Sequence, residues 1–145
     1  MIGGRSDAET AEVLEIIEHS ALVNMDFYEV SARRHDAPRE EVEDGQLTIQ
    51  VQQRATDTNF GVRLTASVIS LQGEATASVA GEYELLHGIA PSRRALQLFA
   101  DEVSVMTVFP YVREAIATIT AKVFGEPVHL PLIQRGEVVV NKDEV

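Results

Sequence analysis

Hydrophobic and polar residues alternate along the middle of the chain, and this period of two predicts β-strands. The clearest case is the segment in which Leu47, Ile49 and Val51 alternate with threonine and glutamine. Turn-forming residues at Asp57-Thr58-Asn59 and at Ser70 to Gly73 separate it from later segments of the same kind. The pattern predicts four strands, at Asp26–Arg34, 47–52, 60–68 and 74–86.

The start of the chain has helical periodicity instead. Ser6 or Asp7 can cap a helix over residues 7–20, whose first turns carry glutamates that suit the positive end of the helix dipole. Its apolar residues form a narrow stripe at Ala11, Leu14, Ile17 and Ala21. We therefore expect this helix to lie at the periphery of the fold.

Two further helices are predicted after the fourth strand. Ser92 can cap one that runs from Arg93 to about Val103. A second, longer helix is predicted to begin at Phe109-Pro110, because proline suits the first helical position, and to end at Gly125.

These elements predict an α+β fold: a four-stranded antiparallel β-meander followed by a short helix and one long helix, with an N-terminal helix. Short connections between consecutive strands favour antiparallel pairing, because parallel strands need crossover segments. The length of 145 residues suits a single domain. Within residues 1–145 we predict an N-terminal helical extension (1–21), a core (22–133) and a tail (134–145).

Composition narrows the classes of function. Hydrophobic residues make up 45% of the chain, and cysteine is absent, which removes disulfides and thiol chemistry. The formal net charge of −11 argues against nucleic-acid binding. The chain lacks an apolar run long enough to cross a bilayer, and its start lacks an export-signal pattern. We expect a cytoplasmic protein with no membrane insertion.

The residue types that usually carry catalysis form no recognisable motif. His19, His35, His87 and His129 are scattered, without the spacing of a metal site. Serines are plentiful, but none stands in a nucleophile elbow, and no glycine-rich phosphate loop is present. The sequence therefore predicts no enzyme activity, no metal and no cofactor. Its five phenylalanines and three tyrosines supply bulky apolar side chains for a small domain, which predicts exposed apolar surface and oligomerisation.

One segment carries a specific resemblance. Val108 to Ile116 reads VFPYVREAI and closely resembles the FPYARE signature at the start of the long helix of SecB chaperones. Upstream, Gly88-Ile89 and the short helix fit the same spacing, and Asp36-Ala37-Pro38 stands where the family closes its first strand. Downstream, 128–133 resembles the piece that follows the family's long helix. The resemblance covers roughly residues 22–133.

The resemblance implies an ATP-independent chaperone, a tetramer built as a dimer of dimers, which binds non-native polypeptides and passes some of them to the SecA translocase. The resemblance also implies that the long helix serves assembly. The predicted interface residues are therefore Tyr111, Val112, Ala115, Ile116, Ile119 and Val123. A chaperone for many sequences needs adaptable apolar surface. We therefore predict client contacts at Phe27, Tyr28, Val30, Phe60, Leu85, Leu86, Phe99, Met106 and Phe109.

Two features depart from the export-type pattern. Gln134 to Val145 has no amphipathic pattern where the family has its last helix. Arg33 and Arg34 stand where export chaperones are neutral or acidic, which argues against docking to SecA. SecB-like proteins without such features protect the antitoxin of toxin–antitoxin–chaperone systems. The client is thus either an unfolded preprotein or an antitoxin.

Two other classes of function are also compatible with the sequence. The first is a small-ligand-binding protein or hot-dog-like thioesterase. That fold wraps its sheet around a helix placed early in the chain, whereas here the long helix follows all four strands. The second is an assembly adaptor that binds one folded partner.

Overall fold

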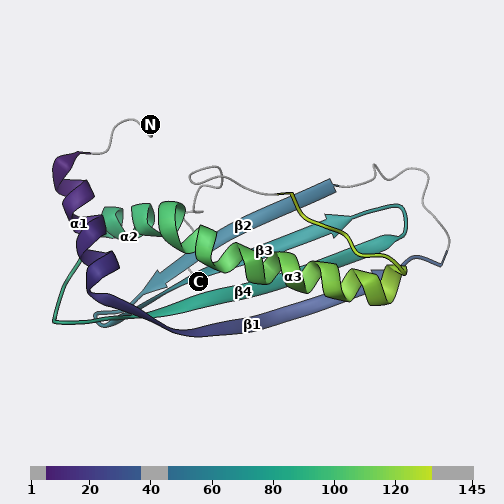
Figure 1. Ribbon diagram of the computed structural model, residues 1–145, viewed down its shortest axis with the longest axis horizontal. Helices are drawn as coiled ribbons and strands as arrows, with labels where there is room; N and C mark the ends of the chain where they lie inside the picture. The colour runs from purple at the N-terminus through teal and green to yellow at the C-terminus, as the bar shows by residue number, and fades with distance from the viewer. Residues whose placement is uncertain (1–5, 37–45, 132–145) are drawn as a thin grey trace.

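The computed structural model describes residues 6–36 and 46–131 of the chain. An N-terminal helix, α1 (Asp7–Glu18), precedes four strands, which are followed by a long helical segment (Figure 1). The strands are β1 (Ser20–Arg34), β2 (Gln46–Ala55), β3 (Asn59–Ile69) and β4 (Gly73–Leu85). The helical segment comprises α2 (Arg93–Phe99), a π-helical turn (Ala100–Ser104) and α3 (Val105–Phe124). The predicted α+β class is confirmed.

Helix α1 begins with a capping box. Ser6 Oγ accepts a hydrogen bond from the Glu9 backbone N–H at 3.1 Å, and Glu9 Oε1 accepts one from the Ser6 N–H at 2.9 Å. The bond from the Ser6 backbone, followed by that from Arg94, holds the pKa of Glu9 below its usual value. Arg94 Nε lies 3.1 Å from Glu9 Oε2, so the same glutamate also ties α1 to α2.

The four strands form one antiparallel sheet in the order β1-β4-β3-β2. The predicted meander holds for β2, β3 and β4, but β1 pairs with β4 and lies at the opposite edge from β2. Val79 and Ala77 of β4 pair with Phe27 and Val30 of β1 in this arrangement. In this position β1 gives β4 a hydrogen-bonded neighbour on each side. Because this pairing is nonlocal, it cannot be predicted from the lengths of the connections between strands.

Strand β1 begins earlier than predicted, at Ser20, and its register with β4 shifts between Leu22 and Asn24 and again between Phe27 and Glu29. These irregularities break the simple alternation that would mark a strand in the sequence. The second one places Phe27 and Val30 on the same face of the sheet, the face that α3 packs against, and Tyr28 on the other.

The two helices predicted at 93–103 and from Phe109 are in fact continuous. The backbone of Ser104 is helical and α3 starts at Val105, so the prediction that a new helix begins at Phe109-Pro110 was wrong. Pro110 lies inside α3, where it cannot donate a backbone hydrogen bond. Met106 and Pro110 are both exposed, so water can reach the carbonyl that loses its partner. The predicted Ser92 cap and the end at Gly125, whose φ is +89°, are confirmed.

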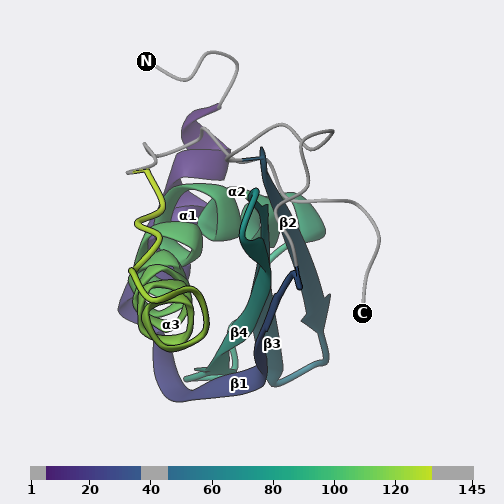
Figure 2. The same cartoon turned by 90° about the vertical axis from the view of Figure 1, so that its right-hand side faces the viewer.

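The core lies between α3 and one face of the sheet (Figure 2). Val62, Leu64 and Val79 from the sheet are fully buried with Val112 and Ile116 from α3. At one end Phe60 stacks on Tyr83 with ring centroids 4.7 Å apart, and Phe99 meets both rings edge-on at 5.4 Å. The Tyr83 hydroxyl is hydrogen-bonded to Ser104 Oγ at 2.7 Å, which joins the sheet to the π-helical turn, and burial raises the pKa of this phenol.

Candidate functional site

An apolar groove of about 250 Å³ lies between β1 and α3. Its walls come from Phe27 and Val30 of β1 and from one flank of α3, namely Glu114, Ala115, Thr118, Ile119 and Lys122. The irregularity in β1 and the helical spacing of 3 to 4 residues in α3 together bring these side chains to one side of the molecule. Glu114 and Lys122 are the charged residues of this flank, and both are exposed. Thr118 Oγ1 donates a hydrogen bond to Glu114 Oε1 at 2.8 Å.

Large apolar side chains remain half-exposed around this groove. Phe27 is 51% exposed, Val30 is 41% exposed and Tyr111 is 46% exposed. The rings of Phe27 and Tyr111 meet edge-on with centroids 6.5 Å apart, so they form one continuous surface. A cluster of exposed apolar residues of this kind is typical of a binding surface.

The groove runs beside an open sheet edge. Among the strands that the structure describes, β1 pairs with β4 alone, so its other edge carries unpaired backbone N–H and C=O groups. An edge of this kind can pair with an extended polypeptide. Leu22 and Val23, at the beginning of the same strand, are also exposed, at 44% and 53%. The site thus combines backbone partners with apolar side-chain contacts.

The nine predicted client contacts do not form one surface. Phe60, Phe99 and Phe109 lie in the core, with exposed fractions of 3%, 3% and 4%. As placed in this chain they cannot contact a client, and the prediction is corrected for these three residues. They were selected as bulky aromatics, and the sequence does not distinguish an aromatic residue that closes the core from one that faces outward.

The other predicted client residues are spread over four places. Phe27 and Val30 line the groove, whereas Tyr28 lies on the opposite face of the sheet. Leu85 and Leu86 lie at the end of β4 that pairs with the start of β1. Met106 is exposed on α3 but, five residues before Tyr111, points to a different side of the helix.

The predicted interface residues of the long helix also divide. Val112 and Ile116 are fully buried in the core, so the prediction is corrected for these two. Ala115 and Ile119 line the groove, Tyr111 stands at its rim, and Val123 packs at the edge of the core. Glu114 and Lys122 also line the groove and were not predicted from the sequence, although their spacing from Thr118 places all three on the same side of the helix.

The described residues were compared with two further kinds of site, a metal centre and a membrane-spanning helix. No three histidine, aspartate or glutamate side chains gather to hold a metal ion within the described part of the chain. In residues 6–36 and 46–131 no helix is long and apolar enough to span a membrane. The tail from Gln134 to Val145, where the sequence lacks the pattern of a last helix, lies outside the described residues.

Comparison with known proteins agrees with this architecture. No family model matches the chain. The SecB-like chaperone SmegB of Mycolicibacterium smegmatis is 30% identical over 135 residues, which is 92% of this chain and 90% of that protein. The Rv1957 SecB-like chaperone of Mycobacterium tuberculosis, solved with a ChAD peptide from the HigA1 antitoxin, superposes with a TM-score of 0.73. That match covers 86% of this chain and 98% of Rv1957 at 16% identity, and therefore shows a common fold.

The fold, an antiparallel sheet covered on one face by a long helix, is that of the SecB-like chaperones. With the SmegB match at 30% identity over nearly its whole length, this chain belongs to the SecB-like chaperone family. The predicted family resemblance and the predicted chaperone class are confirmed. The alternative of a hot-dog-like thioesterase gains no support from these relatives.

Proposed function

We propose that this protein is an ATP-independent holdase that keeps extended, unfolded polypeptide segments from aggregating, and that its clients include an antitoxin. The observation that carries the proposal is the open edge of β1 beside an apolar groove, with Phe27 half-exposed between them. This arrangement serves binding and needs no catalytic group.

The mechanism follows from the geometry of strand addition. A client segment pairs its backbone with the free N–H and C=O groups of β1, which any sequence can do. Alternate side chains of an added strand point to opposite faces, so every second one lies toward α3. There it meets Phe27, Val30 and Ile119, an apolar surface without a shaped specificity pocket. Backbone pairing thus provides affinity for many sequences, and the groove selects segments with apolar residues at alternate positions.

Two observations favour an antitoxin over a preprotein as the main client. The solved relative with the same fold holds an antitoxin peptide. In addition, the face of the sheet away from α3 does not present a uniformly acidic surface, because Arg33, Arg54 and Arg63 are distributed among its acids. Arg33 is paired with Glu74 on this face. In the export chaperones that the chain resembles, SecA docks on acidic groups. Here such a partner would contact a surface with both basic and acidic side chains.

We also propose that the chain assembles into a homo-oligomer, a tetramer made as a dimer of dimers, in the cytoplasm. The outward face of α3 supports this part of the proposal. Pro110 and Ala121 are exposed there and Ala117 is half-buried, so a helix of another subunit can approach closely. This face borders the groove at Glu114, so assembly and client binding use neighbouring sides of the same helix.

The test is suppression of aggregation without ATP. A chemically denatured model protein is diluted into buffer with increasing amounts of this protein, and light scattering is followed. We expect suppression that approaches completion near one tetramer per client. A sample shown by circular dichroism to be folded that leaves scattering unchanged would contradict the proposal. A thioesterase would instead release thiol from acyl thioesters and leave the scattering unchanged.

A further inference from the structure

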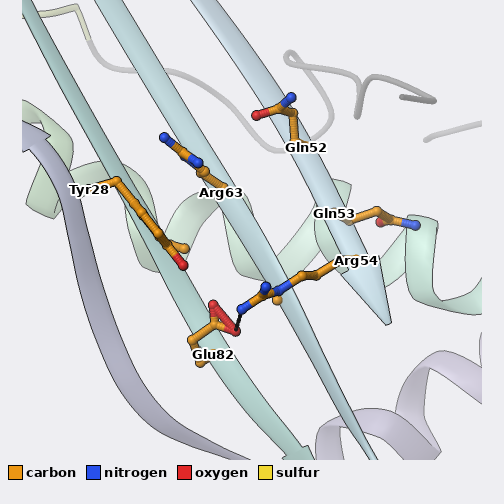
Figure 3. Close-up of a pocket in the computed structure, with 8 residues that line it drawn as sticks. Tyr28, Gln52, Gln53, Arg54, Arg63 and Glu82 are labelled. Carbon is orange, nitrogen blue, oxygen red and sulfur yellow. Dashed lines mark ion pairs between the residues drawn. The ribbon is translucent and has the colours of Figure 1, made fainter. Parts of the chain in front are cut away.

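The face of the sheet that points away from α3 holds a small hollow with two arginines. It lies across β1, β4, β3 and β2 and is lined by Tyr28, Gln52, Gln53, Arg54, Gly61, Arg63, Ala80 and Glu82 (Figure 3). Its volume is about 80 Å³, well below the roughly 300 Å³ at which a site begins to enclose a small-molecule ligand. The hollow is therefore suited to one functional group of a larger partner.

Arg63 is held in a fixed orientation in this hollow. Its Nε donates a hydrogen bond to Ser78 Oγ at 2.7 Å, and Ser78 is in turn bonded to Thr65 Oγ1 at 2.8 Å. The Tyr28 ring covers the guanidinium, whose central carbon lies 4.2 Å from the ring centroid. This stacking and the Nε bond fix the plane of the group, so little entropy is lost when it binds an anion.

The terminal amino groups of Arg63, Nη1 and Nη2, bond to no residue in the described part of the chain. Two acids on the same face of β1 are bonded elsewhere: Asp26 accepts from Asn24, and Glu29 accepts from Ser31. Ser78, which anchors Arg63, is itself buried, with 1% of its surface exposed. The surrounding residues therefore fix the orientation of Arg63, and its Nη1 and Nη2 groups remain available to a ligand.

Glu82, the acid of the hollow, is directed toward the other arginine. Its Oε1 lies 3.6 Å from Arg54 Nη2 (Figure 3). The carboxylate lies flat across Gly61, where a Cβ would come within 2.6 Å of Oε1, so the glycine is what allows this position. With two arginines and one glutamate, the lining carries one positive charge in excess, in a chain whose formal net charge is −11.

We propose that this hollow binds a carboxylate side chain of a protein partner, with Arg63 as its bidentate donor. A carboxylate matches the paired Nη donors in plane and spacing. Because the hollow is small, a free small acid gains little there, and the remaining affinity has to come from polypeptide contacts with the surrounding polar sheet face. The site lies on the opposite face from the β1–α3 groove and does not depend on the function proposed for that groove.

The experiment uses the full chain, labelled with ¹⁵N, and follows the Nε–Hε signal of Arg63 by NMR. The probes are a capped ten-residue peptide in which Glu alternates with Thr, the same peptide with Gln for Glu, and inorganic phosphate. We expect a saturable shift with the Glu peptide, and at least tenfold weaker binding of the Gln peptide and of phosphate. Equal responses to the Glu and Gln peptides, or to phosphate, would overturn the assignment.

A pair of matched variants separates this site from general charge effects. Arg63→Lys keeps the charge but loses the fork and its Nε–Hε signal, so its binding is followed on the backbone amides, and the Glu peptide should bind about tenfold more weakly. Arg33→Lys changes an arginine on the same face that already pairs with Glu74, and should leave the affinity unchanged. Aggregation suppression should be unaltered in both variants, so that the two proposals fail or succeed separately. An Arg63→Lys variant that is folded and binds the Glu peptide as well as the unchanged chain would also overturn the proposal.

Discussion

We predict that Phe27→Ala weakens the binding of an unfolded client by an amount that follows from the exposure of Phe27 in the groove. The side chain is 51% exposed in the subunit, so a client that covers it removes about half of its surface from water. Complete burial of a phenylalanine side chain contributes about 1.5–3 kcal/mol, and half of that is about 0.8–1.5 kcal/mol. The dissociation constant for an unfolded client should therefore rise by a factor of about 4 to 13.

The same side chain also contributes to the fold, because its other half is already buried against α3 and its ring contacts Tyr111. The variant should lose about 1 kcal/mol of unfolding free energy, which lowers Tm by roughly 4 °C in a domain of this size. Leu14→Ala is a matched control, because Leu14 is 52% exposed but lies on α1, outside the groove. It should cost comparable stability without changing client affinity.

The assay is fluorescence anisotropy of a labelled, permanently unfolded protein, titrated with each variant well below its Tm. Weaker binding by Phe27→Ala with unchanged binding by Leu14→Ala supports the groove. Equal affinities for all three proteins would show that the client does not contact Phe27, and equal losses in both variants would show that stability rather than contact governs binding.

Three further predictions concern assembly, the π-helical turn and the N-terminal cap. Ala121→Glu places a charge on the exposed face of α3 and should reduce the particle mass measured by light scattering, whereas an unchanged mass would remove this face from the interface. Tyr83→Phe should cost about 1–3 kcal/mol in urea unfolding because it strands the Ser104 hydroxyl, and combining it with Ser104→Ala should cost less than the sum; strictly additive losses would contradict the bond. The pKa of Glu9 is lowered in the folded state, so its carboxylate stabilises the fold above its ordinary pKa of 4.5, and this contribution is lost as the pH falls through the lowered value. Glu9→Gln should therefore be less stable than the unchanged chain at pH 7, with a difference that shrinks below pH 4.5; a difference independent of pH would argue against the cap.

The sequence predicted the features that are decided locally. The alternation in β2 and β3, the serine caps of α1 and α2 and the glycine that ends α3 each depend on a few neighbouring residues, and the structure has all of them. The order of the strands depends instead on the nonlocal pairing of β1 with β4. The turn that joins α2 to α3 contains Ser104, whose hydroxyl is hydrogen-bonded to Tyr83, 21 residues earlier in the chain.

The functional surface could be predicted only in part for a similar reason. Phe27 and Phe60 are both aromatic residues in predicted strands, yet one is half-exposed and the other buried. What separates them is the edge position of β1 and its irregular register, neither of which the periodicity reveals. Ala115 and Phe27 were predicted for different roles, yet both line one groove, because α3 packs beside the edge strand β1.

Hydrogen exchange, measured with and without an unfolded client, shows whether clients bind along β1 beside α3. At constant particle mass, we expect slower exchange of the backbone amides of β1 around Phe27–Val30 when the client is added, with α1 unchanged. Protection confined to other segments, or none at a client concentration that saturates binding, would contradict it.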